Sequence, residues 1–462
     1  MWHLRPAASG RRGAGLARHI LETVKLAVPV MIGRSGTLIM ITADVIMTGR
    51  AGARELAYYG LAYGATQVLV VIGLGAMTGT TVLASQADGR GDAKQCGAVW
   101  KVGLAHALAM GVVFAALCVL GERFLLLTGQ SAELARNAGR AMLMSALGLP
   151  PMLMYLATAL FLEGIRRPQP NMWLMLAANL INIALNWLLI YGHTVAGLGS
   201  VGGMGAAGAA LATALTRWLM FLALAAYVLT MADGGRFGMR ERARHPMELG
   251  RKLRRIGVPL GLAQGLESTA FTALVLMAGL LGSAHLAVYQ IALNLLSVVY
   301  MLAMGVGAAT SVRVGHAVGR ADLRGLSRAG WVGAGIAMAM LSCICALFQV
   351  IPGVLAGIYT GDGTLLALAI PVLTIAGLFI VVDGGQGVMV GALRGVGDVW
   401  VPSGMVVAGF WGLTVPLGHH LAFARQMGVA GLLWGLFAGA LLALVMLLGR
   451  FYWITHREIK PL

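Results

Sequence analysis

Residues 366–392 read LALAIPVLTIAGLFIVVDGGQGVMVGA, an apolar run that carries one charged side chain, Asp383. A helix needs about 20 residues to cross the roughly 30 Å hydrocarbon core of a bilayer. A carboxylate at the centre of such a helix costs on the order of 2.5–3.5 kcal/mol on insertion scales, and such a group usually faces the inside of a bundle. The run therefore predicts a transmembrane helix with a functional acid.

The composition extends this interpretation to the whole chain. Of its 462 residues, 59% are hydrophobic and only 11% are charged, whereas soluble domains carry roughly 25% charged residues. The apolar runs do not alternate as barrel strands do, and backbone groups in lipid must be satisfied internally. We therefore expect an all-α integral membrane protein with twelve transmembrane helices. The predicted spans are 23–48, 56–84, 98–119, 141–162, 171–191, 202–231, 255–281, 286–311, 330–356, 366–392, 402–423 and 428–449.

The net charge of +17 is distributed as a topology signal. Lys and Arg accumulate in the cytoplasmic loops of membrane proteins, and most of them fall at one set of predicted helix ends. We expect a multi-pass protein of the bacterial inner membrane with both termini cytoplasmic, contact with membrane lipid and no nucleic-acid partner. The basic N-terminal stretch lacks a short apolar core with a cleavage site, so we interpret it as a cytoplasmic tail. The predicted outer loops hold only Arg50, Arg54, Arg123, Arg136 and Arg425.

The chain repeats itself at an offset of 230 residues. KLAVPV at 25–30 resembles RIGVPL at 255–260, and GTTVLASQADGRGD at 79–92 resembles the segment 308–322. Each half holds six predicted spans, an even number, so both halves begin on the same side of the membrane, as in parallel repeats. We predict two pseudo-symmetric six-helix bundles. Their bounds are 1–235, which includes the cytoplasmic tail, and 254–462, joined by a basic cytoplasmic linker at 236–253.

Three acids stand alone in apolar runs, namely Asp44, Glu267 and Asp383, and the repeat does not duplicate them. Burial and a neighbouring like charge both make a carboxyl group easier to protonate. We predict that Glu267 and Asp383 bind the coupling cation, either H⁺ or, as a metal site, Na⁺. Asp44 is predicted to bind substrate or protons. The alternative for each acid is a group that only ties helices together.

Two arginines also lie within predicted spans, Arg34 and Arg217. Buried arginine in a membrane usually has a partner. Arg34 shares its span with Asp44, but ten helical residues separate them by about 15 Å. We therefore expect Arg34 to pair with an acid on another helix, in either a coupling or a structural role.

Uncharged polar residues form two stripes. Asn179, Asn182 and Asn186 recur on one helical face, and Gln290 and Asn294 form a shorter stripe in another span. Both stripes fit either a cavity wall or hydrogen bonds between helices.

No motif points to a bound cofactor or to enzyme chemistry. GMGAAG at 203–208 matches G-x-G-x-x-G but opens an apolar span with no strand before it. His419 and His420 are adjacent rather than four residues apart, which does not favour a metal site. The sequence has no P-loop lysine motif that would point to ATP. We expect no cofactor, with Na⁺ or H⁺ as the coupling ion, and no enzyme activity.

Five segments resemble one known family. They are AVP at 27–29, DVIMTG at 44–49, YQIALN at 289–294, VRVGH at 312–316 and GALRG at 391–395. Taken together, these segments are similar to those of the MATE (multidrug and toxic compound extrusion) transporters, and most of all to the NorM-like members. The resemblance covers nearly the whole chain.

The resemblance implies two six-helix bundles around a central cavity that alternates between inward-open and outward-open states. It also implies that Asp44, Glu267 and Asp383 occupy the acidic positions used for substrate and cation binding. Two positions depart from the family pattern. Phe379 stands where members with a described sodium site carry a tyrosine, and Tyr289 replaces a common histidine.

We therefore expect a monomeric antiporter in which inward movement of Na⁺ or H⁺ drives export of small organic molecules, amphipathic and cationic or aromatic. The alternative within the same superfamily is a flippase for lipid-linked saccharides, which would favour a basic cavity. A polytopic membrane enzyme would need a nucleophile or metal cluster that the sequence lacks. A receptor would have no need for three buried acids.

Overall fold

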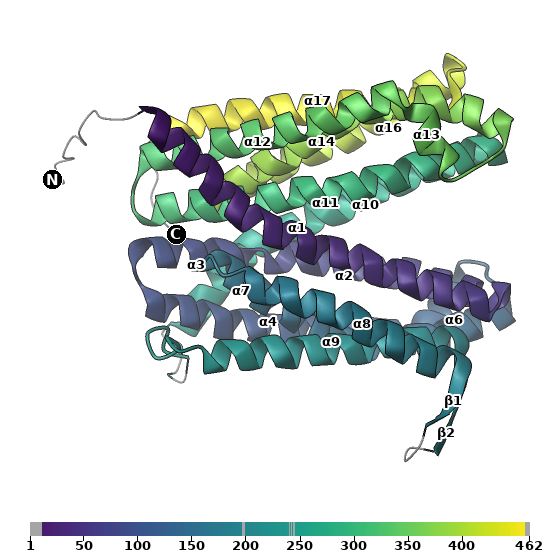
Figure 1. The fold of residues 1–462 in the computed structure, drawn as a ribbon, viewed down its shortest axis with the longest axis horizontal. Coiled ribbons are helices and arrows are strands. Elements are labelled where there is room, and N and C mark those ends of the chain that lie inside the picture. The colour runs from purple at the N-terminus through teal and green to yellow at the C-terminus, as the bar shows by residue number, and fades with distance from the viewer. Residues whose placement is uncertain (1–11, 196–198, 240, 242, 244, 458–462) are drawn as a thin grey trace.

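The structure is a computed structural model that describes residues 12–195, 199–239, 241, 243 and 245–457. In this part of the chain, eleven helices are long and apolar enough to cross a membrane, or up to twelve if a bent pair counts as one span. Figure 1 shows these helices running side by side along the long axis of the molecule. The predicted fold class, an all-α membrane protein, is confirmed.

The elements of the first half are α1 (Arg12–Ala51), α2 (Ala53–Met77), α3 (Gly79–Arg90), α4 (Ala93–Val119), α5 (Gly121–Leu127), α6 (Ala132–Leu147), α7 (Leu149–Gly164), α8 (Gln169–Tyr191), β1 (Gly192–Val195), β2 (Gly199–Gly202) and α9 (Gly205–Thr230). Those of the second half are α10 (Pro246–Leu280), α11 (Ser283–Gly319), α12 (Leu323–Val350), α13 (Pro352–Gly357), α14 (Gly363–Val396), α15 (Trp400–Val407), the π-helix η1 (Ala408–Thr414), α16 (Val415–His419), the π-helix η2 (His420–Ala424) and α17 (Gly428–Thr455). We call these two sets the N-bundle and the C-bundle.

The predicted span 141–162 is a bent pair of helices rather than one straight helix. α6 and α7 meet at an angle of 41°. Gly148 lies at the break, and Pro150 and Pro151 follow in the first turn of α7. Proline lacks the N–H that would continue the hydrogen bonding of α6, so the chain bends there.

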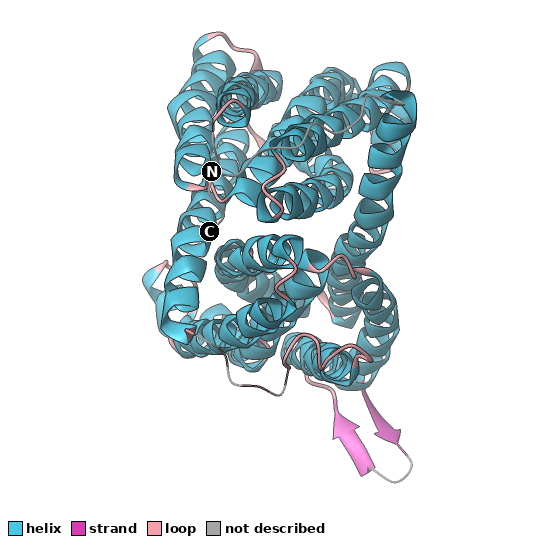
Figure 2. Cartoon of the chain, turned by 90° about the vertical axis from the view of Figure 1, so that its left-hand side faces the viewer, coloured by secondary structure: helices cyan, strands magenta, loops and turns pink. Residues whose placement is uncertain are grey.

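Two local features differ from simple helices. β1 and β2 form an antiparallel hairpin in which Gly192 pairs with Gly202, and it projects from the bundle (Figures 1 and 2). This hairpin is not evident from the sequence, because the segment is short and rich in glycine. The predicted span 402–423 contains the two π-helices η1 and η2. Pro416 follows η1 closely and has no N–H to donate, which disturbs the regular helical bonding.

The linker between the halves is shorter than predicted. α9 ends at Thr230 and α10 begins at Pro246, so residues 246–253 of the predicted linker form the first turns of α10. Proline is favoured in the first turn of a helix, where its missing N–H has no partner to lose.

Figure 2 shows the two bundles from one end, with a long helix running along each side between them. α1 is one crossing helix: in Figure 1 it begins beside the C-bundle and ends beside the N-bundle. Near its start, Ala27 packs with Val306 and Ala309 of α11. Further along, a β-carbon built on Gly36 would collide with the Met175 side chain of α8. α1 therefore connects the two bundles mechanically.

α10 makes the matching connection on the other side. Near its middle it crosses α2 so closely that a β-carbon on Gly75 would lie 2.6 Å from Cα of Gly261. Further along, Phe271 packs on Phe410 of η1 with ring centroids 5.5 Å apart, and Trp411 donates a hydrogen bond to the carbonyl oxygen of Leu266 at 2.9 Å. Glycine is required at the crossing because no side chain fits between the backbones.

The repeated segments adopt the same local structure. Asp92 accepts a hydrogen bond from N of Gln95 and caps α4, and Asp322 accepts one from N of Gly325 and caps α12. The two repeats also meet each other, since a β-carbon on Gly319 would lie 2.9 Å from Cα of Gly89. The duplicated sequence thus forms the contact between the bundles at the end where α1 begins.

Candidate functional site

A cavity of about 550 Å³ lies between the two bundles. Its wall is formed by α1, α2, α6, α7, α8 and α9 on one side and by α10, α11 and α14 on the other. This volume lies within the range of about 300–1,000 Å³ that is typical of small-molecule sites. Among the residues that the structure describes, six charged side chains line it, namely Arg34, Asp44, Glu163, Arg217, Glu267 and Asp383. All three predicted acids therefore face one cavity.

Asp44 lies in the N-bundle wall within a complete set of hydrogen bonds. Its Oδ1 accepts from Nδ2 of Asn186 at 2.6 Å. Its Oδ2 accepts from the Tyr59 hydroxyl at 3.0 Å and from the Thr213 hydroxyl at 2.7 Å. The Asp44 side chain is 1% exposed, and Arg217 lies close enough for the two charges to interact. Such donors favour the ionised carboxylate and hold it in one orientation.

The asparagine stripe lies behind Asp44. Asn186 also donates to Oδ1 of Asn182 at 3.1 Å, and Asn182 donates to the Thr213 hydroxyl at 3.2 Å. Asn179 donates to the carbonyl oxygen of Met175 on its own helix. These three residues are buried and support the wall, whereas Asn171 of the same helix lines the cavity directly.

Glu267 and Asp383 lie in the C-bundle wall, and their surroundings differ from those of Asp44. Asp383 is 7% exposed, and Glu267 on α10 lies near enough for the two carboxylates to interact electrostatically. Within the described part of the chain, neither carboxylate has a hydrogen-bond or ion-pair partner. Phe379, one turn before Asp383 on α14, is 2% exposed and lines the same part of the cavity. These acids can therefore take a proton or a cation.

A fourth acid, Glu163, was not predicted from the sequence. It lies on α7 with 3% of its side chain exposed, and its Oε1 lies 3.7 Å from Nη2 of Arg34. Its other oxygen has no hydrogen-bond partner among the described residues. In the sequence it directly follows the predicted span 141–162 and lies three residues before Arg166. The signal that could have found it was a lone acid at the end of an apolar run, LMYLATALFLEG at 153–164.

Three other candidate residues lie away from the cavity. Tyr289 is fully buried in the C-bundle core, with no partner for its hydroxyl among the described residues. Gln290 is exposed on the surface of α11. Asn294 is also exposed and accepts a hydrogen bond from the Tyr359 hydroxyl at 2.8 Å. A role for these three residues in the cavity stays a prediction that this arrangement does not favour.

Polar contacts between the bundles close the cavity at the end where α1 begins. Nε2 of His316 on α11 lies 2.9 Å from the carbonyl oxygen of Gly164 on α7. A second contact joins an N-bundle side chain to the C-bundle backbone: Gln86 of α3 donates to the carbonyl oxygen of Gly395 on α14 at 3.1 Å. These contacts pair each bundle with the other through buried side chains.

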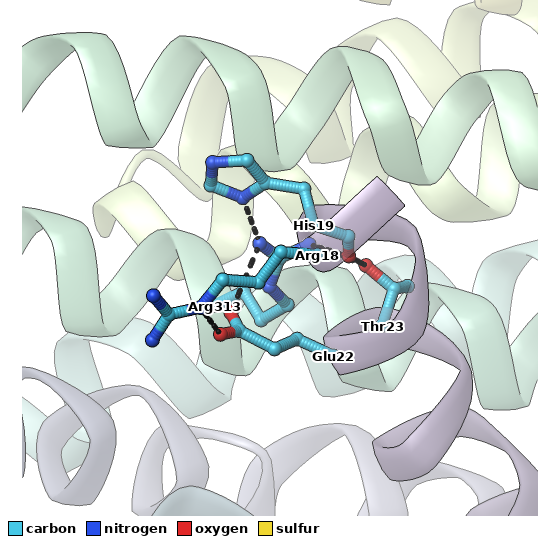
Figure 3. Close-up of polar contacts among 5 residues, drawn as sticks. All are labelled: Arg18, His19, Glu22, Thr23 and Arg313. Carbon is cyan, nitrogen blue, oxygen red and sulfur yellow. Dashed lines mark hydrogen bonds and ion pairs between the residues drawn. The ribbon is translucent and has the colours of Figure 1, made fainter. Parts of the chain in front are cut away.

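The start of α1 also contacts this closed end of the two bundles, which we call the seam. Figure 3 shows Arg313 of α11 reaching across to α1. Its guanidinium donates to the carbonyl oxygen of His19 at 2.8 Å, contacts the Thr23 hydroxyl and the His19 ring, and lies 3.6 Å from Oε2 of Glu22. A buried arginine that loses such partners is costly, so opening this end requires new partners for Arg313.

No group of three or more His, Cys, Asp or Glu side chains in the described chain could hold a metal ion. A transition-metal centre is therefore not indicated for these residues. Two carboxylates and neutral oxygens fit a weakly held alkali cation or a proton instead.

Comparison with known proteins gives a consistent family match. The sequence profile of the MatE family matches residues 29–188 and 259–419, two blocks that begin at the offset of the internal repeat. The "Probable multidrug resistance protein NorM" of Caulobacter vibrioides is 33% identical over 449 residues, which cover 96% of this chain and 93% of that protein. The "Multidrug resistance protein NorM" of Burkholderia vietnamiensis is 31% identical and covers 96% of each chain.

Solved structures share the fold at lower identity. An outward-facing multidrug resistance MATE family transporter of the MOP superfamily superposes with a TM-score of 0.85 at 20% identity, over 97% of this chain and 99% of that one. A eukaryotic MATE transporter gives a TM-score of 0.85 at 20% identity, over 95% and 96% of the two chains.

Proposed function

The chain belongs to the MatE family of transporters, and on that premise we propose that it exports amphipathic, cationic or aromatic compounds by antiport with H⁺ or Na⁺. It is a multi-span membrane transporter rather than an enzyme. We further propose that it resides in the bacterial inner membrane as a monomer, with the end that carries the start of α1 facing the cytoplasm.

The main support for this proposal is that some acids of the cavity have polar partners and others do not. Asp44 already accepts three hydrogen bonds, and Glu163 has Arg34 beside it. Glu267 and Asp383 have no partner of this kind among the described residues. An uncompensated carboxylate pair in a low-dielectric site attracts a cation or takes up a proton. The coupling ion and the cationic group of a substrate would therefore compete at this pair.

The rest of the wall suits large apolar cations. Tyr59 and Tyr63 stack with ring centroids 6.0 Å apart, and Phe271 and Phe379 face the cavity from the C-bundle. Aromatic faces attract organic cations. Several methionines also line the cavity, and their flexible thioether side chains adapt to ligands of different shape. This combination supports broad rather than narrow substrate recognition.

The closed seam supports a transport mechanism of alternating access. In that mechanism, this structure would be the outward-facing state. If the start of α1 is cytoplasmic, the contacts of His316, Gln86 and Arg313 seal the cytoplasmic side. Uptake of the cation by Glu267 and Asp383 from outside would displace a bound cationic substrate and permit the return step. One charge crossing 100 mV gains about 2.3 kcal/mol, so a single ion provides a substantial driving force.

Either coupling ion fits the residues present. Na⁺ would be held by the two carboxylates and by neutral oxygens nearby, whereas H⁺ needs only the carboxylates. Phe379 contributes no oxygen to the site. The acid pair itself supports both alternatives equally.

Site variants test the proposal in a cellular or vesicle efflux assay with a fluorescent lipophilic cation. Glu267→Gln and Asp383→Asn should each slow efflux at least tenfold, because each removes a charge that must bind the cation. The matched control is Glu248→Gln, which alters the same kind of group at the exposed start of α10, where Glu248 pairs with Lys252. Efflux at the wild-type rate in both site variants would refute the site assignment.

The flippase alternative is less well supported. A lipid-linked saccharide carries phosphate and would need uncompensated cations, but both arginines of the cavity lie beside acids. The same efflux assay separates the alternatives, because a flippase would not move the dye under any ion gradient.

A further inference from the structure

Arg217 is a charged residue of the cavity wall that the proposed cation site does not use. It lies on α9, where the cavity is lined by Ala210, Thr213, Arg217 and Met220. These four residues recur every three or four positions, so they share one side of the helix. The Arg217 side chain therefore belongs to the cavity wall rather than to the packed interior of the N-bundle.

The break between α6 and α7 makes room for this side chain. A β-carbon built on Gly148 would lie 2.8 Å from Cα of Ala214 and 3.3 Å from Cδ of Arg217. Because Gly148 has no side chain, α9 approaches the break closely and the Arg217 stem extends past it. Ser145, one turn earlier on α6, also lines the cavity. The bend thus allows a long cationic side chain at the cavity wall.

The Arg217 guanidinium is balanced in charge but not in hydrogen bonds. Asp44 lies near enough to interact with it electrostatically. Both carboxylate oxygens of that acid, however, already accept hydrogen bonds from Asn186, Tyr59 and Thr213. Among the described residues, Arg217 has no hydrogen-bond partner. A guanidinium carries five N–H donors, and unused donors in a low-dielectric wall are costly, so a ligand that accepts from them would be favoured.

The charges of the cavity decide which acceptor suits Arg217 best. The planar guanidinium fork matches the two oxygens of a carboxylate. A free anion is disfavoured, because Asp44 lies near Arg217, and Glu267 and Asp383 add negative charge to the same cavity. A carboxylate that belongs to a zwitterion avoids this penalty, since the cationic group of the same molecule can lie at the two unpaired acids.

We propose that Arg217 is a specificity-determining residue that binds the carboxylate of zwitterionic aromatic substrates. The cationic end of the same substrate lies at Glu267 and Asp383. This inference rests on the proposed export function and adds a substrate group that cation binding alone does not require. A cation without a carboxylate uses the acid pair and does not need Arg217.

The test compares two dyes that differ in one group. Rhodamine B carries a carboxylate beside its cationic ring system, and its ethyl ester has the same ring system without the carboxylate charge. In vesicle efflux, Arg217→Met should raise the half-saturating concentration of rhodamine B about tenfold, the size expected when a hydrogen bond between charged groups is lost. The half-saturating concentration of the ester should stay close to the wild-type value.

The matched control is Arg54→Met, which removes an arginine whose side chain is 85% exposed at the start of α2 in the same bundle. It should leave the export of both dyes unchanged. For Arg217→Met with normal yield and melting temperature, an equal loss for both dyes would overturn the proposed role, since it would indicate a structural effect. An unchanged value for rhodamine B would overturn it as well.

A second variant keeps the test decisive if Arg217→Met does not fold. Arg217→Lys retains the positive charge but loses the planar fork, so it should weaken rhodamine B export more than export of the ester. An unchanged preference between the dyes in this variant would overturn the role of Arg217.

The wild type separates this inference from the proposed function. If it exports neither dye under a Na⁺ or a pH gradient, the proposed export function fails. If it exports the ester but not rhodamine B, the export function stands and carboxylate recognition by Arg217 is refuted.

Discussion

At the scale of single residues, the cavity separates acids that are compensated from acids that are not. Asp44 accepts hydrogen bonds from Asn186, Tyr59 and Thr213, whereas Glu267 and Asp383 face open space. Carboxyl groups in one cavity therefore have different surroundings, since three donors orient Asp44 whereas Glu267 and Asp383 have no such partner among the described residues.

The Arg34–Glu163 pair provides a test at this scale. Glu163→Leu alone should destabilise the protein, because it leaves Arg34 unpaired with 19% of its side chain exposed. Replacing both partners, as Arg34→Met with Glu163→Leu, should restore part of the loss, since apolar replacements of buried pairs are often tolerated. We expect a coupling energy of about 1–3 kcal/mol in a double-mutant cycle of thermal or denaturant unfolding. Simple additivity of the two substitutions would show that the pair makes no direct interaction.

The sequence revealed the acids of this site better than their partners. Asp44, Glu267 and Asp383 stand out because charge in an apolar run is rare. Glu163 did not stand out, because it lies just beyond the predicted span 141–162 and close to Arg166 and Arg167. The partners of Asp44 come from α2, α8 and α9, and no spacing within one segment indicates which helices meet.

At the scale of helices, close crossings set the arrangement of the two bundles. The crossing of α2 and α10 leaves no room for a side chain at Gly75 or Gly261. The spans themselves were predictable from their length and apolarity. The bend at Gly148, the hairpin β1–β2 and the π-helices were not, because each depends on local backbone bonding rather than on hydropathy.

Gly75→Val should therefore loosen the closed end. A valine β-carbon would lie 2.6 Å from Cα of Gly261, so the helices must separate. Ser85, fully buried in the seam, reports this opening: in a background without native cysteines, Ser85→Cys should react several times faster with a maleimide when Gly75→Val is also present. Gly64→Val on the same helix is the control, because nothing lies within 4 Å of its position. Equal rates in both variants would contradict the predicted opening.

The connections between helices carry a pH-dependent contact. Arg167, after α7, and Asp233, after α9, form two hydrogen bonds at 2.9 and 2.6 Å. The Arg167 side chain holds the pKa of Asp233 below its ordinary value. A lowered folded-state pKa contributes stability above the unfolded-state pKa, and this stability is lost as the pH falls through the folded-state pKa.

Asp233→Asn should thus cost about 0.5–1 kcal/mol at pH 7, a small value because both partners are partly exposed. The difference in stability between wild type and variant should shrink as the pH falls from 5 towards 3. Unfolding measured across that pH range checks this expectation. A difference that stays constant with pH would mean that the ion pair contributes nothing.

At the scale of the whole molecule, a duplicated scaffold holds a site that is not duplicated. The repeat predicted two bundles, and the structure shows its copies meeting at the closed seam through Gly89 and Gly319. The sequence did not predict that α1 and α10 each run from one bundle to the other, since this depends on packing between distant segments. Because each crossing helix contacts both bundles, a change at Asp44 or Glu267 can reach the seam through one continuous helix.

The most direct test of cation-driven export is dye efflux from vesicles of the purified protein, with Na⁺ and pH gradients imposed separately. We expect at least one gradient to drive efflux of a lipophilic cation, and we expect the Glu267→Gln, Asp383→Asn double variant to abolish it. Absence of efflux under both gradients, with wild-type protein shown to be folded, would contradict cation-driven export.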